Sequence, residues 1–365
     1  MIVDRGYETM KPKERVQQAI NHGKPDRVPI NYMTNEIIDG KLKESLGLKK
    51  SDNEGLLRML GVDFRGMYAP YTGKPLHTSA SKDRRVDPLY GWVTRYIEND
   101  SGGYWDYCDF PLSNAGEEEV AKWPFPNADD YDYDALLDEA KKNKDYALYI
   151  GDPGLGCIIN TIGFLRGMEQ TLIDLISDEP AGLLLIDKLM RSHLSKFERD
   201  LEKVGHLIDL VWIGEDLGTQ HTPLISKAIL HKHILPWHKK FIDIASSYNI
   251  PVMMHTCGSS SWAYEDYIKA GLKGVETLQP EATNMQAEYL KTTYGNRLFF
   301  HGCISTAGPL AYGTTKEVES DTKSILKTMM PGAGYIFSPT HQIQDNTPVE
   351  NIIKMYNTAH THGRY

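Results

Sequence analysis

The residues best suited to chemistry in this sequence are His255 and Cys257, which stand one residue apart at the end of an apolar run. The run, Pro251 to Met254, is typical of a buried strand, and side chains two positions apart in a strand point to the same face. An imidazole nitrogen beside a thiolate sulfur favours Zn²⁺, and a third protein ligand would leave one position open for chemistry. A core histidine beside an inert buried cysteine is the alternative that this pair alone leaves open.

The rest of the chain predicts a barrel that would position this pair. Short apolar runs, about eight in number, are mostly separated by helical stretches and end in polar or glycine-bearing residues. They lie near residues 27–31, 61–65, 146–150, 209–213, 251–258, 274–278, 297–303 and 334–341. We therefore expect one (β/α)₈ barrel domain over residues 1–365, opened by an amphipathic helix at residues 10–22. A doubly wound open sheet is disfavoured because its glycine-rich dinucleotide turn is missing after every candidate strand.

Residues 70–145 interrupt this alternation and are expected to form an irregular insertion over one mouth of the barrel. The segments DPLYGWVTRYIEND and GGYWDYCDFPL alternate aromatic and polar residues, as a β-hairpin does. The aromatic rings of this insertion, among them Trp92 and Tyr104, are candidates to wall a substrate cavity. A surface hairpin whose rings pack on the barrel rim is the other interpretation.

Polar residues that follow separate strands are expected to meet, because barrel strands deliver their carboxyl ends to one rim. The candidates are Asn31, Tyr32, Asp152, Glu215, Asp216, His255, Cys257, Glu276, His301, Cys303 and His341. Either His341 or Cys303 is a candidate third metal ligand.

Several of these side chains also have ordinary structural roles. Glu215 or Asp216 is expected to be an oxygen ligand or to orient a ligating histidine, although an acid after a strand often caps the next helix. His301 has the alternative of bonding a backbone carbonyl. Three other histidines lie at helical spacings with no strand end nearby and are expected on the surface: His231, His233 and His238.

Composition excludes several classes of function. The 365 residues carry 40 Lys and Arg against 49 Asp and Glu, and a net charge of −9 leaves no basic surface for nucleic acid or acidic lipid. The amino-terminal segment MIVDRGYETMKPKERVQQAI lacks the apolar core of a signal peptide, and no stretch has the roughly 18 apolar residues of a membrane span. Four scattered cysteines suit reduced thiols. We therefore expect a cytoplasmic protein that binds neither nucleic acid nor membranes.

Several segments together resemble the uroporphyrinogen decarboxylase superfamily over nearly the whole chain. They are RVPINY, IGEDLGTQHTPLIS, MHTCGS, LFFHGCIST with LAYGTTKEV, and PGAGYIFSPTHQIQDNTPVENI. The resemblance implies a (β/α)₈ barrel that is often dimeric, so a homodimer is expected. The superfamily divides into tetrapyrrole decarboxylases and zinc methyltransferases that work with corrinoid proteins.

The decarboxylase branch is disfavoured because it needs an arginine-bearing Met-Arg-Gln-Ala-Gly-Arg segment after the first strand to hold substrate carboxylates. Here the corresponding residues, 30–35, read INYMTN, and a substrate with many carboxylates would lack charged partners. The methyltransferase branch uses a His-x-Cys-Gly segment as two zinc ligands, which matches His255 and Cys257. Its third ligand is a cysteine in a Pro-Gly-Cys segment, where this chain has Pro339-Thr340-His341. That departure weakens the expectation of coenzyme M methylation and keeps Cys303 as a possible substitute.

The resemblance implies a zinc-dependent methyltransferase that exchanges a methyl group between a small donor, such as an aromatic methyl ether, and cob(I)amide on a partner corrinoid protein. The alternatives are a decarboxylase of a smaller carboxylated substrate and a non-catalytic barrel that binds a corrinoid or tetrapyrrole. Residues expected to orient substrate or stabilise developing charge are Asp152, Glu215 and Asp216. Residues expected to contact substrate are Asn31, Tyr32, Trp92, Tyr104 and His301.

Overall fold

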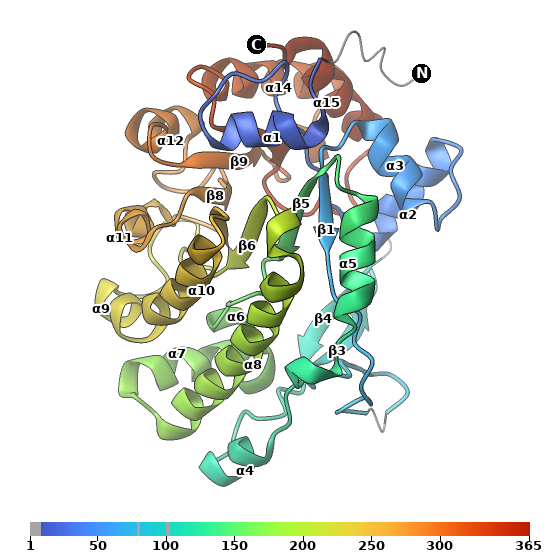
Figure 1. Cartoon of the computed structure of the whole chain (residues 1–365). Coiled ribbons are helices and arrows are strands. Elements are labelled where there is room, and N and C mark those ends of the chain that lie inside the picture. The colour runs from blue at the N-terminus through green and yellow to red at the C-terminus, as the bar shows by residue number, and fades with distance from the viewer. Residues whose placement is uncertain (1–8, 79–80, 100–102) are drawn as a thin grey trace.

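The computed structural model describes residues 9–78, 81–99 and 103–365, and its centre is a parallel sheet of seven strands (Figure 1). The strand order is β1-β5-β6-β7-β8-β9-β10, and every pairing is parallel. The strands are β1 (Phe64–Met67), β5 (Ala147–Gly151), β6 (Leu210–Gly214), β7 (Val252–Thr256), β8 (Gly274–Thr277), β9 (Phe299–Ile304) and β10 (Tyr335–Pro339). These strands are almost entirely buried, which explains why they read as apolar runs rather than as alternating patterns.

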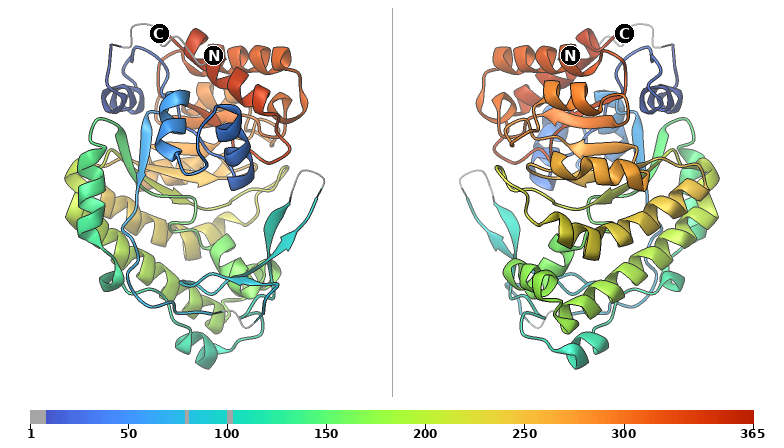
Figure 2. Two further views of the ribbon diagram at one scale, coloured as in Figure 1. Left: turned by 90° about the vertical axis from the view of Figure 1, so that its right-hand side faces the viewer. Right: turned by 90° about the vertical axis from the view of Figure 1, so that its left-hand side faces the viewer.

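Helices surround the sheet, and the two side views show the sheet curled inside them (Figure 2). The α-helices are α1 (Pro12–Ile20), α2 (Glu36–Ser45), α3 (Asn53–Leu60), α4 (Glu117–Lys122), α5 (Tyr133–Lys142), α6 (Ile159–Arg166), α7 (Met168–Ser177), α8 (Pro180–Val204), α9 (Lys227–Ile229), α10 (Leu235–Ser247), α11 (Tyr264–Ala270), α12 (Ala287–Tyr294), α13 (Pro309–Tyr312), α14 (Thr315–Met329) and α15 (Val349–His362). Short 3₁₀ turns are η1 (Ala128–Asp130), η2 (Gly205–Leu207) and η4 (Ser261–Ala263), and η3 (Leu230–Ile234) is a π-helical segment. The fold is therefore α/β with a curled parallel sheet, consistent with a (β/α)₈-type barrel.

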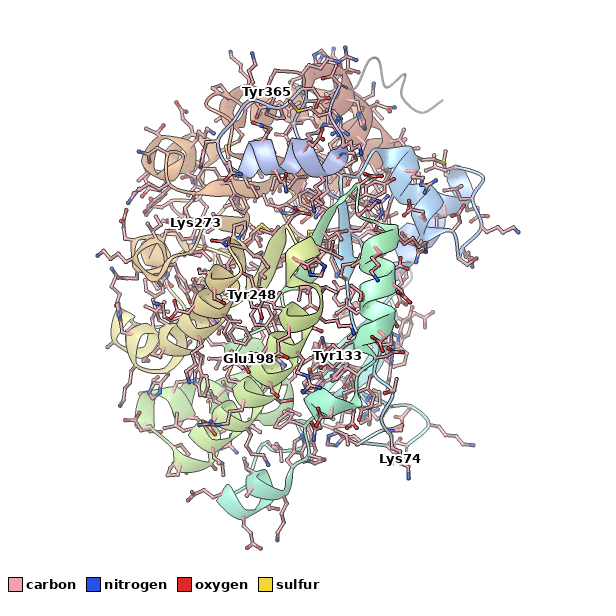
Figure 3. All side chains as sticks on the ribbon, viewed as in Figure 1. Lys74, Tyr133, Glu198, Tyr248, Lys273 and Tyr365 are labelled. Carbon is pink, nitrogen blue, oxygen red and sulfur yellow. The ribbon has the colours of Figure 1, made fainter. Side chains whose placement is uncertain are left out.

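Helix α8 shows why these segments are helical and how they pack. Pro180 occupies its first turn, where a missing N–H costs nothing. Its buried residues, from Ala181 to Val204, recur every three to four positions and form one face, and the helix packs against α4, α5, α7 and α10. Polar residues such as Glu198 lie on the outer face (Figure 3). None of the helices in the described part of the chain combines the length and the hydropathy needed to cross a membrane.

The expected first strand, residues 27–31, forms only isolated bridges, a parallel one between Ile30 and Phe337 of β10 and an antiparallel one between Arg27 and Arg364. Pro29 has no N–H to offer a ladder, and the carboxylate of Asp63 accepts the N–H of Ile30 at 2.8 Å. The segment still connects the edges of the sheet. The N–H of Asn31 donates to the carbonyl of Phe337 at 2.9 Å, and the N–H of Asp63 donates to the carbonyl of Ile30 at 2.9 Å. It therefore fills the gap between β10 and β1 without being a regular strand.

The expected insertion contains a separate antiparallel sheet of β2 (Arg85–Val86), β3 (Val93–Ile97) and β4 (Tyr104–Cys108). β3 and β4 pair from Val93 with Cys108 to Ile97 with Tyr104, so the hairpin is confirmed, and residues 100–102 lie outside the described residues. The side views show this hairpin projecting beside the curled sheet (Figure 2). The irregular region ends earlier than expected, because residues 133–142 form α5, which packs against α8 and β1.

The expected amino-terminal helix is present as α1, and it lies across the amino ends of the strands. Its Arg15 bonds Asp63, which precedes β1, at 2.6 Å. Its Gln17 donates to Asp209, which precedes β6, at 2.8 Å. These contacts close the end of the sheet opposite to the one where the predicted site residues lie.

Candidate metal centre and adjoining cavity

Three side chains bring metal-ligand atoms together at the carboxyl ends of β7 and β10. One donor atom from each of His255, Cys257 and His341 lies within 4.8 Å of the others, the one such group in the described part of the chain. Two strands separate β7 from β10, which in a flat sheet would place them about 14 Å apart. The curl of the sheet therefore creates the cluster.

The alternation of side chains in β7 aims its two donors as the sequence predicts. Cys257 Sγ lies 3.3 Å from His255 Nε2. The chain then turns away at Gly258, where φ is +70° and an added Cβ would lie 2.2 Å from the carbonyl oxygen of Gly218. Only glycine fits such a position without strain, so the turn that ends the His-x-Cys segment is fixed.

The other ring nitrogen of His255 is held by the neighbouring strand. His255 Nδ1 forms a short hydrogen bond with Glu276 Oε2 and lies 3.0 Å from Thr277 Oγ1. Burial opposes a charged imidazolium, but the carboxylate of Glu276 and the Cys257 thiol outweigh it and raise the pKa of His255. The carboxylate fixes which nitrogen carries the proton and leaves Nε2 directed at the cluster, the arrangement that zinc-ligating histidines show.

The cluster fits zinc by both its chemistry and its dimensions. Ligand atoms around a tetrahedral zinc, at about 2.3 Å for sulfur and 2.0 Å for nitrogen, are about 3.5 Å apart, close to the separation of Cys257 Sγ and His255 Nε2. Burial raises the pKa of the Cys257 thiol, so a cation is needed to hold it as a thiolate. Three protein ligands would leave the fourth position open.

Cys303, the alternative third ligand, is not brought to this cluster. It is buried, and burial raises the pKa of its thiol well above the usual range, with Lys291 of α12 as the nearby charge that acts on it. Gly302 and Cys303 both have positive φ, +124° and +72°, which interrupts the strand alternation after His301. His341 is therefore the third member of the donor group.

Asp216 lies against the cluster. Its Oδ1 accepts the N–H of Cys257 at 2.8 Å and stands 3.6 Å from His255 Nε2, while its Oδ2 accepts from Asn160 at 2.7 Å. Burial opposes ionisation, but His255 and these hydrogen bonds outweigh it and lower the pKa of Asp216. A charged carboxylate therefore stands beside the proposed ligands.

Glu215 has a different environment. Its carboxyl group is fully buried and accepts the N–H groups of Ile158 and Ile159, at 2.9 and 3.0 Å, at the start of α6. Burial raises the pKa of Glu215 to about 8. It thus holds a helix terminus in the wall of the site, the capping role that the sequence left open.

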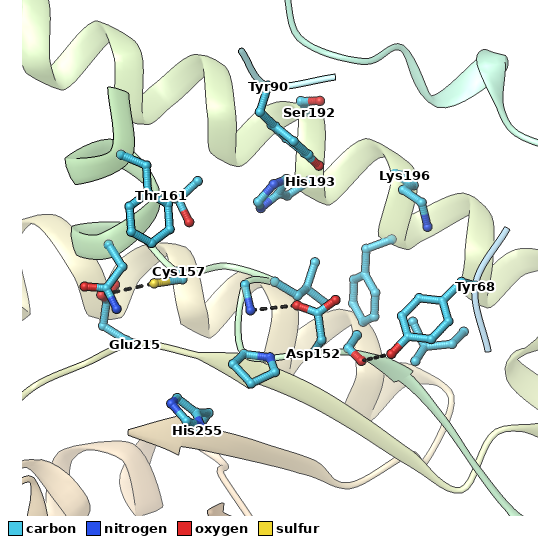
Figure 4. A pocket seen from close by; sticks show the side chains of 18 of the residues that line it. Tyr68, Tyr90, Asp152, Cys157, Thr161, Ser192, His193, Lys196, Glu215 and His255 are labelled. Atoms are coloured by element: carbon cyan, nitrogen blue, oxygen red, sulfur yellow. Dashed lines mark hydrogen bonds between the residues drawn. The ribbon is translucent and has the colours of Figure 1, made fainter. Parts of the chain in front are cut away.

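A cavity of about 520 Å³ adjoins the cluster (Figure 4). His255 and His341 form part of its wall, as do Glu215 and Asp216. Aromatic residues supply much of the remainder, from the insertion and from helices α6 and α8: Tyr90, Trp92, Tyr107, Tyr131, Phe164 and Phe197. The aromatic insertion therefore walls a cavity, although Tyr96, Tyr104 and Trp105 on the same hairpin are about half exposed.

Asp152 reaches this cavity from the end of β5. The preceding Gly151 has φ of +90°, and an added Cβ there would lie 2.1 Å from the carbonyl oxygen of Trp212. The backbone turns at this glycine, and Asp152 Oδ1 then accepts the N–H of Gly154 at 2.7 Å. The Asp152 carboxylate is thereby held at the wall of the cavity. The residue that was expected to orient substrate therefore lies beside the space in which a substrate would bind.

Of the five residues expected to contact substrate, Trp92 lines the cavity, and the other four lie elsewhere among the described residues. His301 is fully buried inside the sheet, where its Nε2 lies 3.0 Å from Asn31 Nδ2. Tyr32 donates instead to Asp39 of α2 at 3.1 Å, and Tyr104 lies on the outer part of the hairpin. The order of residues along a strand predicts how near they are to the rim but not which side of it they face.

Sequence reasoning missed His193 and Lys196, which reach the cavity from α8. Burial lowers the pKa of His193 to about 4. These positions lie in a long helix with no strand end nearby, so only their place on its buried face could have indicated them. The expectation that His238 is a surface residue is wrong. It is fully buried, with its ring nitrogens 2.7 Å from the Tyr267 hydroxyl and 3.0 Å from the carbonyl of Gly156.

Comparison with known proteins relates this chain to one family and to several solved structures. No curated protein matches the chain. A methyltransferase from Methanosarcina mazei shares the fold, with a TM-score of 0.60 and 15% identity over 96% of this chain and 98% of that one. Xylanase 10B from Thermotoga maritima aligns with 61% of this chain and 76% of its own, at 13% identity and a TM-score of 0.37. The family model for uroporphyrinogen decarboxylase (URO-D) matches residues 165–362, more than half of the chain, including all three cluster residues. The chain therefore belongs to the uroporphyrinogen decarboxylase (URO-D) family.

Proposed function

We propose that this chain is a zinc-dependent methyltransferase that moves a methyl group between a small methylated donor and a corrinoid protein. The observation that carries the proposal is the His255, Cys257 and His341 cluster in the wall of an aromatic cavity. The shared fold with the Methanosarcina mazei methyltransferase is consistent with this proposal, and zinc and the corrinoid partner are inferred from the donor set and the sequence resemblance.

The cavity is poorly suited to the tetrapyrrole branch of the family. Lys196 is the one lysine or arginine among its described lining residues, and Asp200 already pairs with it at 2.6 Å. Four carboxyl groups line the same space: Asp152, Asp200, Glu215 and Asp216. A substrate with several carboxylates would find no unpaired lysine or arginine among these described residues and would be repelled by the charged Asp216.

Different residues of the chain would bind the metal, position the donor and stabilise charge. His255, Cys257 and His341 would hold the metal, and Glu276 keeps His255 in the required orientation. Bound zinc would supply a Lewis acid that polarises an ether oxygen or keeps a thiol as thiolate. The aromatic walls exclude water from the donor and position it, and the charged Asp216 stabilises positive charge that develops beside the cluster. An aromatic methyl ether, as expected from the sequence resemblance, would stack against these rings.

The test begins with elemental analysis of the purified full-length protein. We expect about one zinc per chain, lost in both His255→Ala and Cys257→Ala. The exposed His221→Ala is the matched control and should retain the metal. Methyl transfer is then measured with anisole and free cob(I)alamin, by the absorbance change on formation of methylcobalamin, and it should disappear with the metal.

Two results would contradict the proposal. A protein that stays free of metal after zinc is supplied would exclude the zinc mechanism and favour the decarboxylase reading. Tight corrinoid binding without methyl transfer, unchanged in Cys257→Ala, would favour a non-catalytic binding barrel.

A further inference from the structure

The cavity contains two pairings of a carboxylate with tyrosine rings, and only one of them holds a cation from the chain itself. The ammonium group of Lys196 lies 2.6 Å from Asp200 Oδ2 and 4.9 Å from the centre of the Tyr131 ring. A cation held between a carboxylate and an aromatic face is a favourable arrangement because the charge and the ring quadrupole both attract it. Lys196 therefore already occupies the cation position between Asp200 and the Tyr131 ring.

The second pairing is centred on Asp152, and the chain supplies no cation for it. Among the described residues Asp152 forms no ion pair, whereas Asp200 pairs with Lys196 and Asp216 lies 3.6 Å from His255. Within the described ranges of the chain, its carboxylate accepts a hydrogen bond only from the N–H of Gly154. Asp152 is thus an exposed carboxylate that Gly154 holds in place at the lining of the cavity.

Two tyrosine side chains, Tyr68 and Tyr90, lie near this carboxylate at the cavity. Burial raises the pKa of the Tyr68 and Tyr90 hydroxyls well above the usual range, and the charge of Asp152 adds to the effect on both, so the two phenols stay neutral close to it. Tyr90 stacks on Trp92 with ring centres 4.8 Å apart, and Trp92 meets Phe164 edge to face at 5.9 Å. Figure 4 shows Tyr68, Asp152 and Tyr90 directed into the same space.

We infer that Asp152, Tyr68, Tyr90 and Trp92 form a subsite for a small organic cation, and that a methyl donor carrying a positively charged ammonium group is preferred over a neutral ether such as anisole. The statement that the bound cation is the methyl donor rests on the proposed function. The cation subsite itself needs neither zinc nor a corrinoid. A neutral aromatic ether would use the rings and leave the Asp152 carboxylate without a partner. A carboxylated donor would be repelled by it.

The geometry also allows one molecule to reach both parts of the site. Asp152 and the cluster residues His255 and His341 line the same cavity of about 520 Å³. A small donor bound with its ammonium group at Asp152 can therefore direct another part toward the cluster. The subsite would fix the orientation of the donor, which is how binding energy away from the reacting bond assists a transfer.

The experiment is a calorimetric titration of the full-length protein with three probes of one shape and different charge. They are choline, the uncharged isostere dimethylbutanol in which carbon replaces nitrogen, and the anion dimethylbutanoate. We expect choline to bind about tenfold more tightly than dimethylbutanol, and dimethylbutanoate to bind most weakly. Asp152→Asn should reduce choline affinity about tenfold and leave dimethylbutanol unchanged. Asp138→Asn, which removes an exposed carboxylate from α5, should change neither.

Equal binding of choline and dimethylbutanol, or unchanged choline binding in Asp152→Asn, would overturn the inference. A second variant, Trp92→Leu, should weaken choline binding through loss of the ring even if Asp152→Asn folds poorly. Titrations before and after zinc removal separate the two proposals. Choline binding that persists in a protein without zinc or methyl transfer would uphold the subsite and refute the methyltransferase. Zinc binding with methyl transfer but no preference for choline would do the reverse.

Discussion

The two ends of the curled sheet both carry ionisable residues, but those at the amino end are buried and paired, whereas those at the carboxyl end line a cavity. At the amino end, Arg15 donates to Asp26 at 2.7 Å and to Asp63 at 2.6 Å, and Arg27 donates to Asp63 at 2.7 Å. At the carboxyl end, the ligand atoms of His255, Cys257 and His341 face one another, and Asp152 has no ion-pair partner among the described residues.

The difference separates a structural polar cluster from a functional one. Both Arg15 and Asp63 are fully buried, and groups so removed from water must find partners within the chain. The network at the amino end does so and is closed to any ligand. The donors at the carboxyl end are fixed by hydrogen bonds on one side, as His255 is by Glu276, and keep their other side toward a cavity. Positioned groups that lack a partner at a cavity indicate a bound species, here a cation.

The largest effect is expected on the free energy of unfolding, when the buried network of Arg15, Arg27 and Asp63 is broken. Asp63→Asn removes the negative charge shared by Arg15 and Arg27, and loss of one member of a buried ion network costs about 3–5 kcal/mol. The free energy of unfolding, measured by urea denaturation, should fall by that amount. Asp134→Asn, which removes an exposed carboxylate paired with Lys203, should leave it unchanged within error. Zinc affinity of the folded Asp63→Asn protein should equal that of the wild type, and a marked loss would show that the two ends are not independent.

The next largest effect concerns the third ligand at the open end. His341→Ala should weaken zinc binding at least 100-fold, or about 2.7 kcal/mol, because one of three protein ligands is lost. Cys303→Ala should leave zinc affinity unchanged, since this thiol is buried away from the cluster. Competition with a chelating dye measures both. The reverse result, with Cys303→Ala losing the metal, would restore the alternative that the sequence left open.

The sequence predicted those parts of the site that depend on local periodicity. The His-x-Cys pair follows from two-residue alternation in β7, and the measured 3.3 Å between Nε2 and Sγ agrees with it. Most strands lie within a few residues of their expected positions because buried parallel strands are continuous apolar runs.

What the sequence did not predict depends on departures from regular geometry. Positive φ at Gly302 and Cys303 breaks the alternation in β9, so Cys303 does not join the cluster. Pro29 and the Asp63 carboxylate reduce the first strand to isolated bridges. His193 and Lys196 come from a helix that the curl of the sheet brings over the cavity. Such long-range placement leaves no local pattern in a single sequence.

The smallest predicted effect tests whether the open end is ordered before the metal arrives. Glu276→Gln keeps the size of the side chain but removes the carboxylate that holds His255 Nδ1, and changes of this kind reduce metal affinity by roughly 10- to 100-fold. Thr277→Val removes the weaker contact to the same nitrogen, 3.0 Å away, and should cost less than the Glu276 change. Zinc affinity is measured by dye competition, with urea denaturation to confirm that both variants are folded. Glu276 Oε1 has no hydrogen-bond partner among the described groups. We therefore expect this carboxylate to contribute little to the free energy of unfolding. The opposite result would be a Glu276→Gln protein whose free energy of unfolding falls as much as that of Asp63→Asn while its zinc affinity stays the same. Glu276 would then have a structural role like that of the closed network, and the contrast between the two ends of the sheet would not hold at this residue.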